Sequence, residues 1–233
     1  MLQRLFPLPG EPTTITDSYL VERPQLGERP WIALCMVASI DGSTVLEGAS
    51  RKLSCATDRE VMLTLRSVAD MIIVGAGTVR AEGYRAPKKP GQRIGVVSLS
   101  GRVDVNTDLF TSGAGFLITT EDAPDTGVET VRAGASTVDL RRAVCALPGS
   151  PTVVQAEGGA SLNGALAQAD LIDEINLTTS PLLVGGGGSR ALRGGDVEHR
   201  YRLAHLLEDE GFLFSRYVRA EMSATASGRP PQA

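Results

Sequence analysis

The clearest indication of the fold comes from one stretch of the sequence, Ile72-Ile73-Val74-Gly75-Ala76-Gly77-Thr78-Val79-Arg80-Ala81-Glu82-Gly83-Tyr84-Arg85. It begins as a short apolar run, breaks at glycines and continues with residues typical of a helix start. A strand that turns into a helix in this way points backbone N–H groups at an anion. The segment is therefore expected to hold a phosphate.

A second turn of the same kind lies downstream, at Val153-Val154-Gln155-Ala156-Glu157-Gly158-Gly159-Ala160-Ser161. A single glycine turn after a strand is often only a tight connection between two elements. Two such turns in one chain favour a dinucleotide cofactor.

Short apolar or β-branched runs alternate with helical periodicity along the chain, which predicts an α/β sheet with crossover helices. The predicted strands are Trp31–Val37, Met71–Val74, Arg93–Ser98, Gly115–Thr119, Pro151–Gln155, Glu174–Thr179 and Leu213–Val218. The predicted helices are Asp58–Ala69, Asp139–Leu147 and Ser161–Ala169. The first helix is placed by the capping-box pattern Thr57-Asp58-Arg59-Glu60.

One domain is expected, over residues 13–220. Residues 1–12 contain three prolines and the tail 221–233 is rich in Ala, Ser, Gly and Pro, so both ends are expected to be flexible.

Composition limits the class of protein. The 233 residues are 42% apolar, enough for a core, and their net charge of −4 argues against nucleic acid or a membrane surface as partner. Cys35, Cys55 and Cys145 are widely spaced and remote from both histidines, which indicates reduced thiols and no metal site. With no long apolar run or signal peptide, the expected location is the cytoplasm.

The first glycine turn is a weak Rossmann fingerprint, because it lacks a third glycine and the next strand lacks a terminal acid. That strand is followed by Ser98-Leu99-Ser100-Gly101-Arg102. Hydroxyls and a cation suit the 2′-phosphate of NADP better than the free hydroxyl of NAD. An ordinary polar turn is the alternative, and the sequence does not choose between Ser98 and Ser100.

An ordered set of motifs carries a family resemblance. It comprises Val37-Ala38-Ser39-Ile40-Asp41-Gly42, Ser50-Arg51-Lys52-Leu53-Ser54, Leu65-Arg66, Gly75-Ala76-Gly77-Thr78-Val79-Arg80, Glu157-Gly158-Gly159-Ala160-Ser161-Leu162, Leu171-Ile172-Asp173-Glu174 and Ser180-Pro181-Leu182-Leu183-Val184-Gly185-Gly186. In this order the chain resembles the pyrimidine reductase of riboflavin biosynthesis, the C-terminal domain of the bifunctional deaminase-reductase.

The resemblance implies a dihydrofolate-reductase-like three-layer fold, with a mixed, mostly parallel central sheet flanked by helices. It also implies NADPH as cofactor, a homodimer, and reduction of 5-amino-6-(5-phosphoribosylamino)uracil. The zinc motif of the deaminase half has no counterpart in the sequence, so a stand-alone reductase module is expected.

The resemblance also assigns residues. Substrate contacts are implied for Ser50, Arg66, Glu157 and Asp41, and more loosely for Arg85 at the substrate phosphate, although Asp41 also fits a simple turn. The implied cofactor residues are Val37 and Ala38 through their backbones, Lys52, Gly75, Gly77, Thr78 and Glu82, the phosphate-turn residues Ser98, Ser100 and Arg102, and the pyrophosphate cradle Gly158, Gly159, Ala160, Ser161 and Leu162.

Two alternatives remain open at this point. The segment after Thr78 departs from the family pattern, with Glu82 in place of an aspartate and a displaced proline, which leaves a dihydropteridine as the competing substrate. Asp58 would then hold the pteridine, and either Asp58 or Glu157 could deliver the proton. The alternative of another class is a non-catalytic NADP-binding module.

Overall fold

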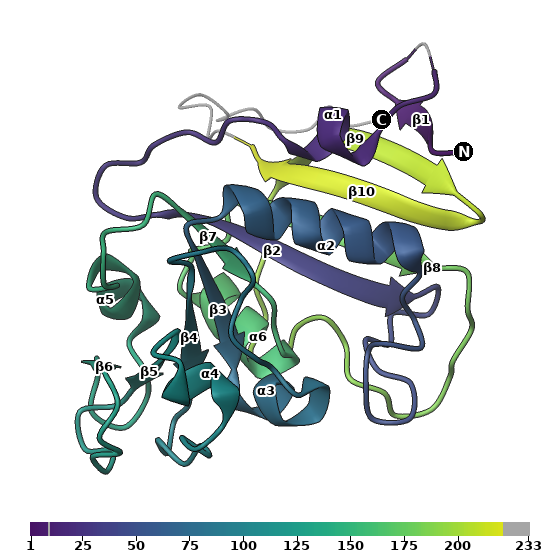
Figure 1. Ribbon diagram of the computed structural model, residues 1–233. Helices are drawn as coiled ribbons and strands as arrows, with labels where there is room; N and C mark the ends of the chain where they lie inside the picture. Colours follow the sequence, from purple (N-terminus) through teal and green to yellow (C-terminus); the bar gives the residue numbers. More distant parts are fainter. Residues whose placement is uncertain (9, 221–233) are drawn as a thin grey trace, which may run out of the picture.

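The computed structural model describes residues 1–8 and 10–220, so the tail expected to be flexible, 221–233, lies outside the described residues. The described strands form one ten-stranded sheet in the order β1-β9-β10-β8-β2-β7-β3-β4-β5-β6 (Figure 1). The strands are β1 (Gln3–Phe6), β2 (Trp31–Ser39), β3 (Met71–Gly75), β4 (Arg93–Val97), β5 (Gly115–Thr119), β6 (Thr130–Arg132), β7 (Val153–Ala156), β8 (Glu174–Ser180), β9 (Tyr201–Asp209) and β10 (Phe212–Arg219).

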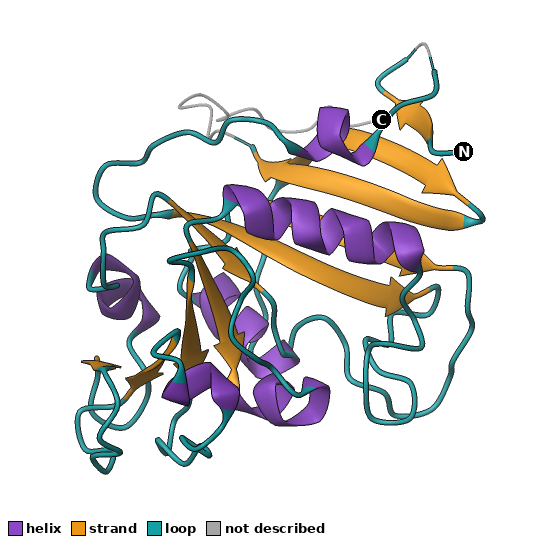
Figure 2. Cartoon of the chain, viewed as in Figure 1, coloured by secondary structure: helices purple, strands orange, loops and turns teal. Residues whose placement is uncertain are grey.

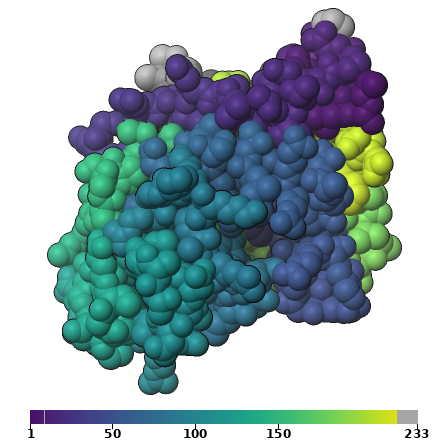
Figure 3. Space-filling view, viewed as in Figure 1, coloured from purple at the N-terminus to yellow at the C-terminus, as the bar shows by residue number. Residues whose placement is uncertain are grey.

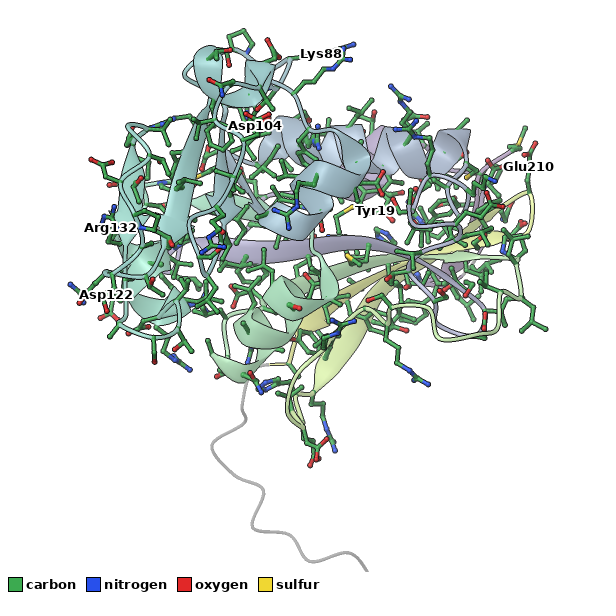
Figure 4. All side chains as sticks on the ribbon, turned by 90° about the horizontal axis from the view of Figure 1, so that it is seen from below. Tyr19, Lys88, Asp104, Asp122, Arg132 and Glu210 are labelled. Atoms are coloured by element: carbon green, nitrogen blue, oxygen red, sulfur yellow. The ribbon has the colours of Figure 1, made fainter. Side chains whose placement is uncertain are left out.

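The sheet is parallel from β8 through β2, β7, β3, β4 and β5 to β6, and antiparallel where β1, β9 and β10 are added beside β8. This confirms the mixed, mostly parallel sheet that the sequence led us to expect. Glu210 in the β9–β10 turn and Arg132 in β6 lie at opposite ends of the molecule (Figure 4).

Helices cover both faces of the sheet (Figure 2). They are α1 (Ile15–Tyr19), α2 (Ala56–Val68), α3 (Ala76–Glu82), α4 (Asp108–Thr111), α5 (Leu140–Cys145) and α6 (Ala160–Gln168). The alternation of side chains in β3 shows the two faces. Ile72 packs with Leu109 and Phe110 of α4, whereas the next residue, Ile73, packs with Leu162 and Leu166 of α6. The fold therefore has three layers, and the predicted α/β class is confirmed.

The capping box predicted at Thr57 is wrong. Helix α2 begins at Ala56, and its N-cap is Cys55, whose Sγ accepts a hydrogen bond from the Asp58 backbone N–H at 3.4 Å. The Thr57 hydroxyl instead donates to the Asp209 carboxylate at 2.7 Å, because β9 passes beside the start of the helix. This two-residue difference leaves Asp58 in the first turn of α2.

Several elements had no counterpart among the expected ones. Gln3–Phe6, in the segment expected to be a flexible end, forms edge strand β1 and pairs with β9. Strand β9 carries no clear alternation, since Leu203, Leu206 and Leu207 mimic a helical spacing. Its turn to β10 has positive φ at Glu210 and Gly211, 50° and 82°, as a two-residue hairpin requires. The Glu-Gly pair was therefore the available signal for the hairpin.

A buried charge cluster fixes the segment before β2 to the start of β8. Glu174 is fully buried and accepts hydrogen bonds from Arg23 at 2.9 and 3.2 Å and from Arg216 at 3.0 Å. Burial alone would raise the pKa of Glu174, but the bonds from Arg216 and Arg23 outweigh it and lower that pKa to about 2. The neighbouring Asp173 binds Arg29 through both carboxylate oxygens, at 2.6 and 2.8 Å.

Candidate functional site

Two cavities adjoin at the carboxyl ends of β3 and β7, where ligands bind in open parallel sheets. The first cavity has a volume of about 770 Å³ and the second about 880 Å³. They share Gly77 and Thr78 from α3 and Gly159 and Ala160 from the start of α6. Figure 3 shows a hollow on one face of the molecule between blue and blue-green segments of the chain.

The two glycine turns meet in the wall between the cavities. The Gly75 N–H donates to the Gly158 carbonyl at 2.6 Å, and Gly158 has a φ of +81°, which favours glycine. A Cβ added at Gly159 would lie only 2.9 Å from the Thr78 hydroxyl. The second turn thus favours glycine at Gly158 because of its positive φ and at Gly159 because the Thr78 side chain approaches closely.

The second cavity runs from the start of α6 to the turn after β4. The candidate cofactor residues that line it are Gly75, Gly77, Thr78, Ser98, Ser100, Arg102, Gly159, Ala160, Ser161 and Leu162. Ser98 is buried, whereas Ser100 and Arg102 are exposed at the rim. Arg80, which the sequence did not single out, also lines this cavity and adds a second cation.

The first cavity contains the acidic candidates. The candidate residues that line it are Val37, Ser50, Asp58, Gly77, Thr78, Glu82, Glu157, Gly159 and Ala160. Asp58 accepts a hydrogen bond of 2.5 Å from the Ser54 hydroxyl. Burial raises the pKa of Asp58, against the opposing effect of hydrogen bonds from Ser54 and Thr178. Asp58 is thus a largely buried carboxyl group that lines this cavity and whose pKa is raised.

Glu157 lies at the end of β7 and is held by donors on both oxygens. Arg66 donates from Nε to Oε1 at 2.7 Å and from Nη2 to Oε2 at 2.6 Å, and Gln155 donates to Oε1 at 2.9 Å. Burial opposes the charge on Arg66, but the bonds to Glu157 raise the pKa of its guanidinium. Arg66 and Glu157 are thus partners of each other, with Glu157 at the cavity surface.

Ser50 and Glu82 are also partners. The Glu82 carboxylate accepts from both the Ser50 backbone N–H, at 2.8 Å, and the Ser50 hydroxyl, at 2.9 Å. The contact joins the loop before α2 to the last turn of α3, and both residues line the first cavity. It connects the two walls of this cavity.

Six candidate residues line neither cavity, and three of them make other contacts or lie at the surface. The Asp41 carboxylate accepts from the Ser39 hydroxyl and the backbone N–H groups of Val184 and Gly185, which lower its pKa to about 2. It shapes the turn after β2. Lys52 forms a surface ion pair with Glu47, and Arg85 is exposed beyond α3.

Three further candidates contribute indirectly. Arg66, Ala38 and Gly158 do not line either cavity. Arg66 contacts Glu157, Ala38 is a buried residue of β2, and Gly158 bonds to Gly75 through its carbonyl.

The first cavity is also lined by Arg51, Arg59 and Tyr84, which were not among the site residues predicted from the sequence. Arg59 and Met62 lie one and four residues after Asp58 in α2 and line the cavity with it. Because helical residues four apart share a face, Asp58 itself was the signal for Met62. Arg51 had only its place beside Ser50 as a signal.

Within residues 1–8 and 10–220, no group of three His, Cys, Asp or Glu side chains is arranged to hold a metal ion. In the same part of the chain, no helix is both long enough and apolar enough to cross a membrane.

The layered sheet and the adjoining cavities define an α/β protein of the dihydrofolate-reductase-like class. Dihydrofolate reductase from Enterococcus faecalis shares this fold, with a TM-score of 0.50 and 14% identity over 81% of this chain and 96% of its own. The chain belongs to the family described as the RibD C-terminal domain, whose model matches residues 30–211. The resemblance inferred from the motifs is thereby confirmed.

Named relatives in this family are reductases. The 2,5-diamino-6-ribosylamino-4(3H)-pyrimidinone 5′-phosphate reductase of Aquifex aeolicus is 30% identical over 85% of this chain and 96% of its own length. The structure of a pyrimidine reductase-like protein from Corynebacterium diphtheriae is similar with a TM-score of 0.77 and 25% identity, over 89% of this chain and 99% of that one.

Proposed function

We propose that this protein is an NADPH-dependent reductase of riboflavin biosynthesis that converts the ribosylamino group of a pyrimidine 5′-phosphate into a ribitylamino group. The observation that carries the proposal is the pair of adjoining cavities, which share Gly77 and Gly159 in the wall between them. The first cavity contains Asp58 and two arginines. The second is lined by the start of α6 and has arginines at its rim.

The second cavity fits the adenosine and phosphate end of NADPH. The amides at the start of α6 suit a pyrophosphate, and the absence of a Cβ at Gly159 leaves room beside Thr78. Ser98, Ser100, Arg102 and Arg80 supply donors of the kind that a 2′-phosphate needs. Val37 at the floor of the first cavity would then lie beside the nicotinamide.

The first cavity fits the pyrimidine and its phosphate. Arg51 and Arg59 are exposed side chains at its surface, and guanidinium groups bind phosphate oxygens well. We assign the substrate phosphate to these two residues rather than to Arg85, which lies outside the cavity. Asp58 and Glu157 would face the ring and the reacting bond.

NADPH, when bound, supplies a hydride. As the C1′–O4′ bond of the ribose breaks, the nitrogen loses its proton and O4′ gains one, which leaves an open-chain C1′=N imine and a 4′-hydroxyl. The imine carbon then receives the hydride and the imine nitrogen receives a proton. Asp58 is proposed to give that proton, because it lines the cavity and burial raises the pKa of its carboxyl group. Glu157 has donors on both oxygens and is proposed to orient the substrate.

Two substrates of this class differ only in the pyrimidine base. The sequence motifs favour 5-amino-6-(5-phosphoribosylamino)uracil, whereas the Aquifex relative is named for the 2,5-diamino-pyrimidinone. The test is NADPH oxidation, followed at 340 nm, with each of these and with dihydrofolate, and again with NADH in place of NADPH. Turnover with either ribosylaminopyrimidine supports the proposal. Turnover with dihydrofolate alone favours the dihydropteridine reductase, and NADPH binding without any turnover favours the non-catalytic module.

Replacing Arg59 with alanine is expected to raise the KM for the phosphorylated substrate about tenfold, because one charge-assisted contact to phosphate is lost. The dephosphorylated substrate should react equally with the wild type and the variant. Arg85→Ala, outside the cavities, is the matched control and should behave as the wild type. Equal losses on both substrates would contradict the assignment of Arg59 to the phosphate.

We further propose a cytoplasmic homodimer. The support for a dimer is an exposed apolar patch of Ile40 (64% exposed), Leu182 (40%) and Leu183 (80%), whose two segments are joined by the Ile40 N–H bond to the Leu182 carbonyl. Light scattering should give twice the chain mass for the wild type and a monomer for Leu183→Asp. A wild-type monomer would contradict the dimer.

The proposed location in the cytoplasm is supported by the cysteines, because Cys35, Cys55 and Cys145 are free thiols.

A further inference from the structure

The Tyr84 side chain lines the first cavity and contacts Glu157 there. Helix α3 ends at Glu82, and Gly83 adopts the left-handed conformation with φ of 66° and ψ of 56°. The chain therefore reverses at Gly83. The Tyr84 hydroxyl then donates a hydrogen bond of 2.5 Å to Oε2 of Glu157, from an element remote in sequence.

The contact completes the set of donors around Glu157. Oε1 accepts from Arg66 and Gln155, whereas Oε2 accepts from Arg66 and Tyr84. The Arg66 guanidinium carbon also lies 5.6 Å from the centre of the Tyr84 ring, a cation–π distance. Tyr84 thus contacts both members of the ion pair.

The Tyr84 hydroxyl is a permanent donor. Burial first, and then the adjacent Glu157 charge, raise the pKa of Tyr84 well above its ordinary value, so the phenol keeps its proton at physiological pH. A buried neutral donor to a carboxylate fixes the direction of the carboxylate without adding charge.

We propose that Tyr84 is a positioning residue of the reductase, which holds the Glu157 carboxylate in the orientation that meets the substrate. The inference rests on the proposed function. Arg66 and Gln155 hold Glu157 from α2 and from its own strand, and Tyr84 is the contact from the α3 side of the cavity. Glu157 immediately precedes Gly158, which lies in the wall between the two cavities. The orientation of Glu157 therefore also sets the position of the substrate relative to the bound cofactor.

The test is a double-mutant cycle with Tyr84→Phe, Glu157→Gln and the double variant. Tyr84→Phe removes only the hydroxyl and is expected to lower kcat about tenfold, with the KM for NADPH unchanged. In the Glu157→Gln background the same change should alter kcat less than about twofold, because Tyr84 acts through Glu157. Tyr201→Phe is the matched control, since the Tyr201 hydroxyl donates to the Ile172 carbonyl, away from both cavities. It should retain the wild-type kcat.

Additive losses in the cycle, or a Tyr84→Phe variant with wild-type kcat, would overturn the inference while leaving the proposed function intact. A wild-type protein without turnover would instead contradict the proposed function. The same four proteins are then compared by calorimetric Kd for the ribosylaminopyrimidine phosphate. Tyr84→Phe should weaken this binding about tenfold only when Glu157 is present, and an equal effect in both backgrounds would overturn the inference.

Discussion

Asp58→Asn is expected to lower kcat at least about 100-fold, since general acid catalysis contributes rate factors of this order. The Kd of NADPH should change little, because the residues proposed to hold its pyrophosphate and 2′-phosphate line the second cavity, which Asp58 does not line. Stopped-flow measurement of NADPH oxidation gives kcat, and fluorescence titration gives the Kd. Asp122→Asn is the control, because Asp122 is exposed at the far end of the sheet (Figure 4).

The pH dependence of kcat is a second test of Asp58 as the proton donor. Burial raises its pKa, and the protonated form is the donor, so kcat should be highest below the raised pKa and fall as pH rises through it. In Asp58→Asn this decline should disappear. A variant that keeps both the wild-type kcat and the decline would remove Asp58 from the mechanism.

Glu174→Gln is expected to destabilise the fold by about 3–5 kcal/mol, the usual cost of breaking a buried ion pair. The substitution leaves Arg23, of which 1% is exposed, and Arg216 with uncompensated buried charge. Urea unfolding followed by circular dichroism measures the loss. Glu129→Gln is the matched control, because Glu129 pairs with Arg93 at the surface and is 54% exposed, so its loss should cost at most about 1 kcal/mol.

Acid is expected to destabilise the fold through protonation of Glu174. The pKa of Glu174 is lowered to about 2 in the folded protein, so its stabilisation is complete above the unfolded pKa and is lost as pH falls toward 2. Glu174→Gln should therefore lose less stability than the wild type over this range. Equal stability of Glu174→Gln and Glu129→Gln near neutral pH would contradict the role given to the buried cluster.

The buried strands in the parallel part of the sheet were the elements most accessible to sequence reasoning. Gly115–Thr119 was predicted with the bounds that β5 has, and β3 and β4 were displaced by a single residue at one end. These strands are buried on both faces, so each is a short continuous apolar run in the sequence. Turn residues at the ends of each run mark its bounds. The antiparallel strand β9 was missed because its leucines do not alternate.

In the candidate site, backbone turns could be predicted from the sequence, whereas side-chain contacts could not. The second glycine turn was recognisable because a positive φ favours glycine at Gly158 and the close approach of the Thr78 side chain favours it at Gly159. By contrast, the partner choices of side chains depend on tertiary packing. No sequence signal indicated that Arg66 pairs with Glu157, and none linked Tyr84 to a residue 73 positions away.

Hydride is proposed to pass from NADPH to C1′ of a ribosylaminopyrimidine 5′-phosphate in the first cavity. The direct measurement uses NADPH carrying deuterium on both positions of nicotinamide C4, with product analysis by mass spectrometry and NMR. The expected product is a ribitylaminopyrimidine phosphate with one deuterium at C1′. A product without deuterium at C1′, or unchanged pyrimidine in the presence of bound NADPH, would contradict the proposed hydride transfer.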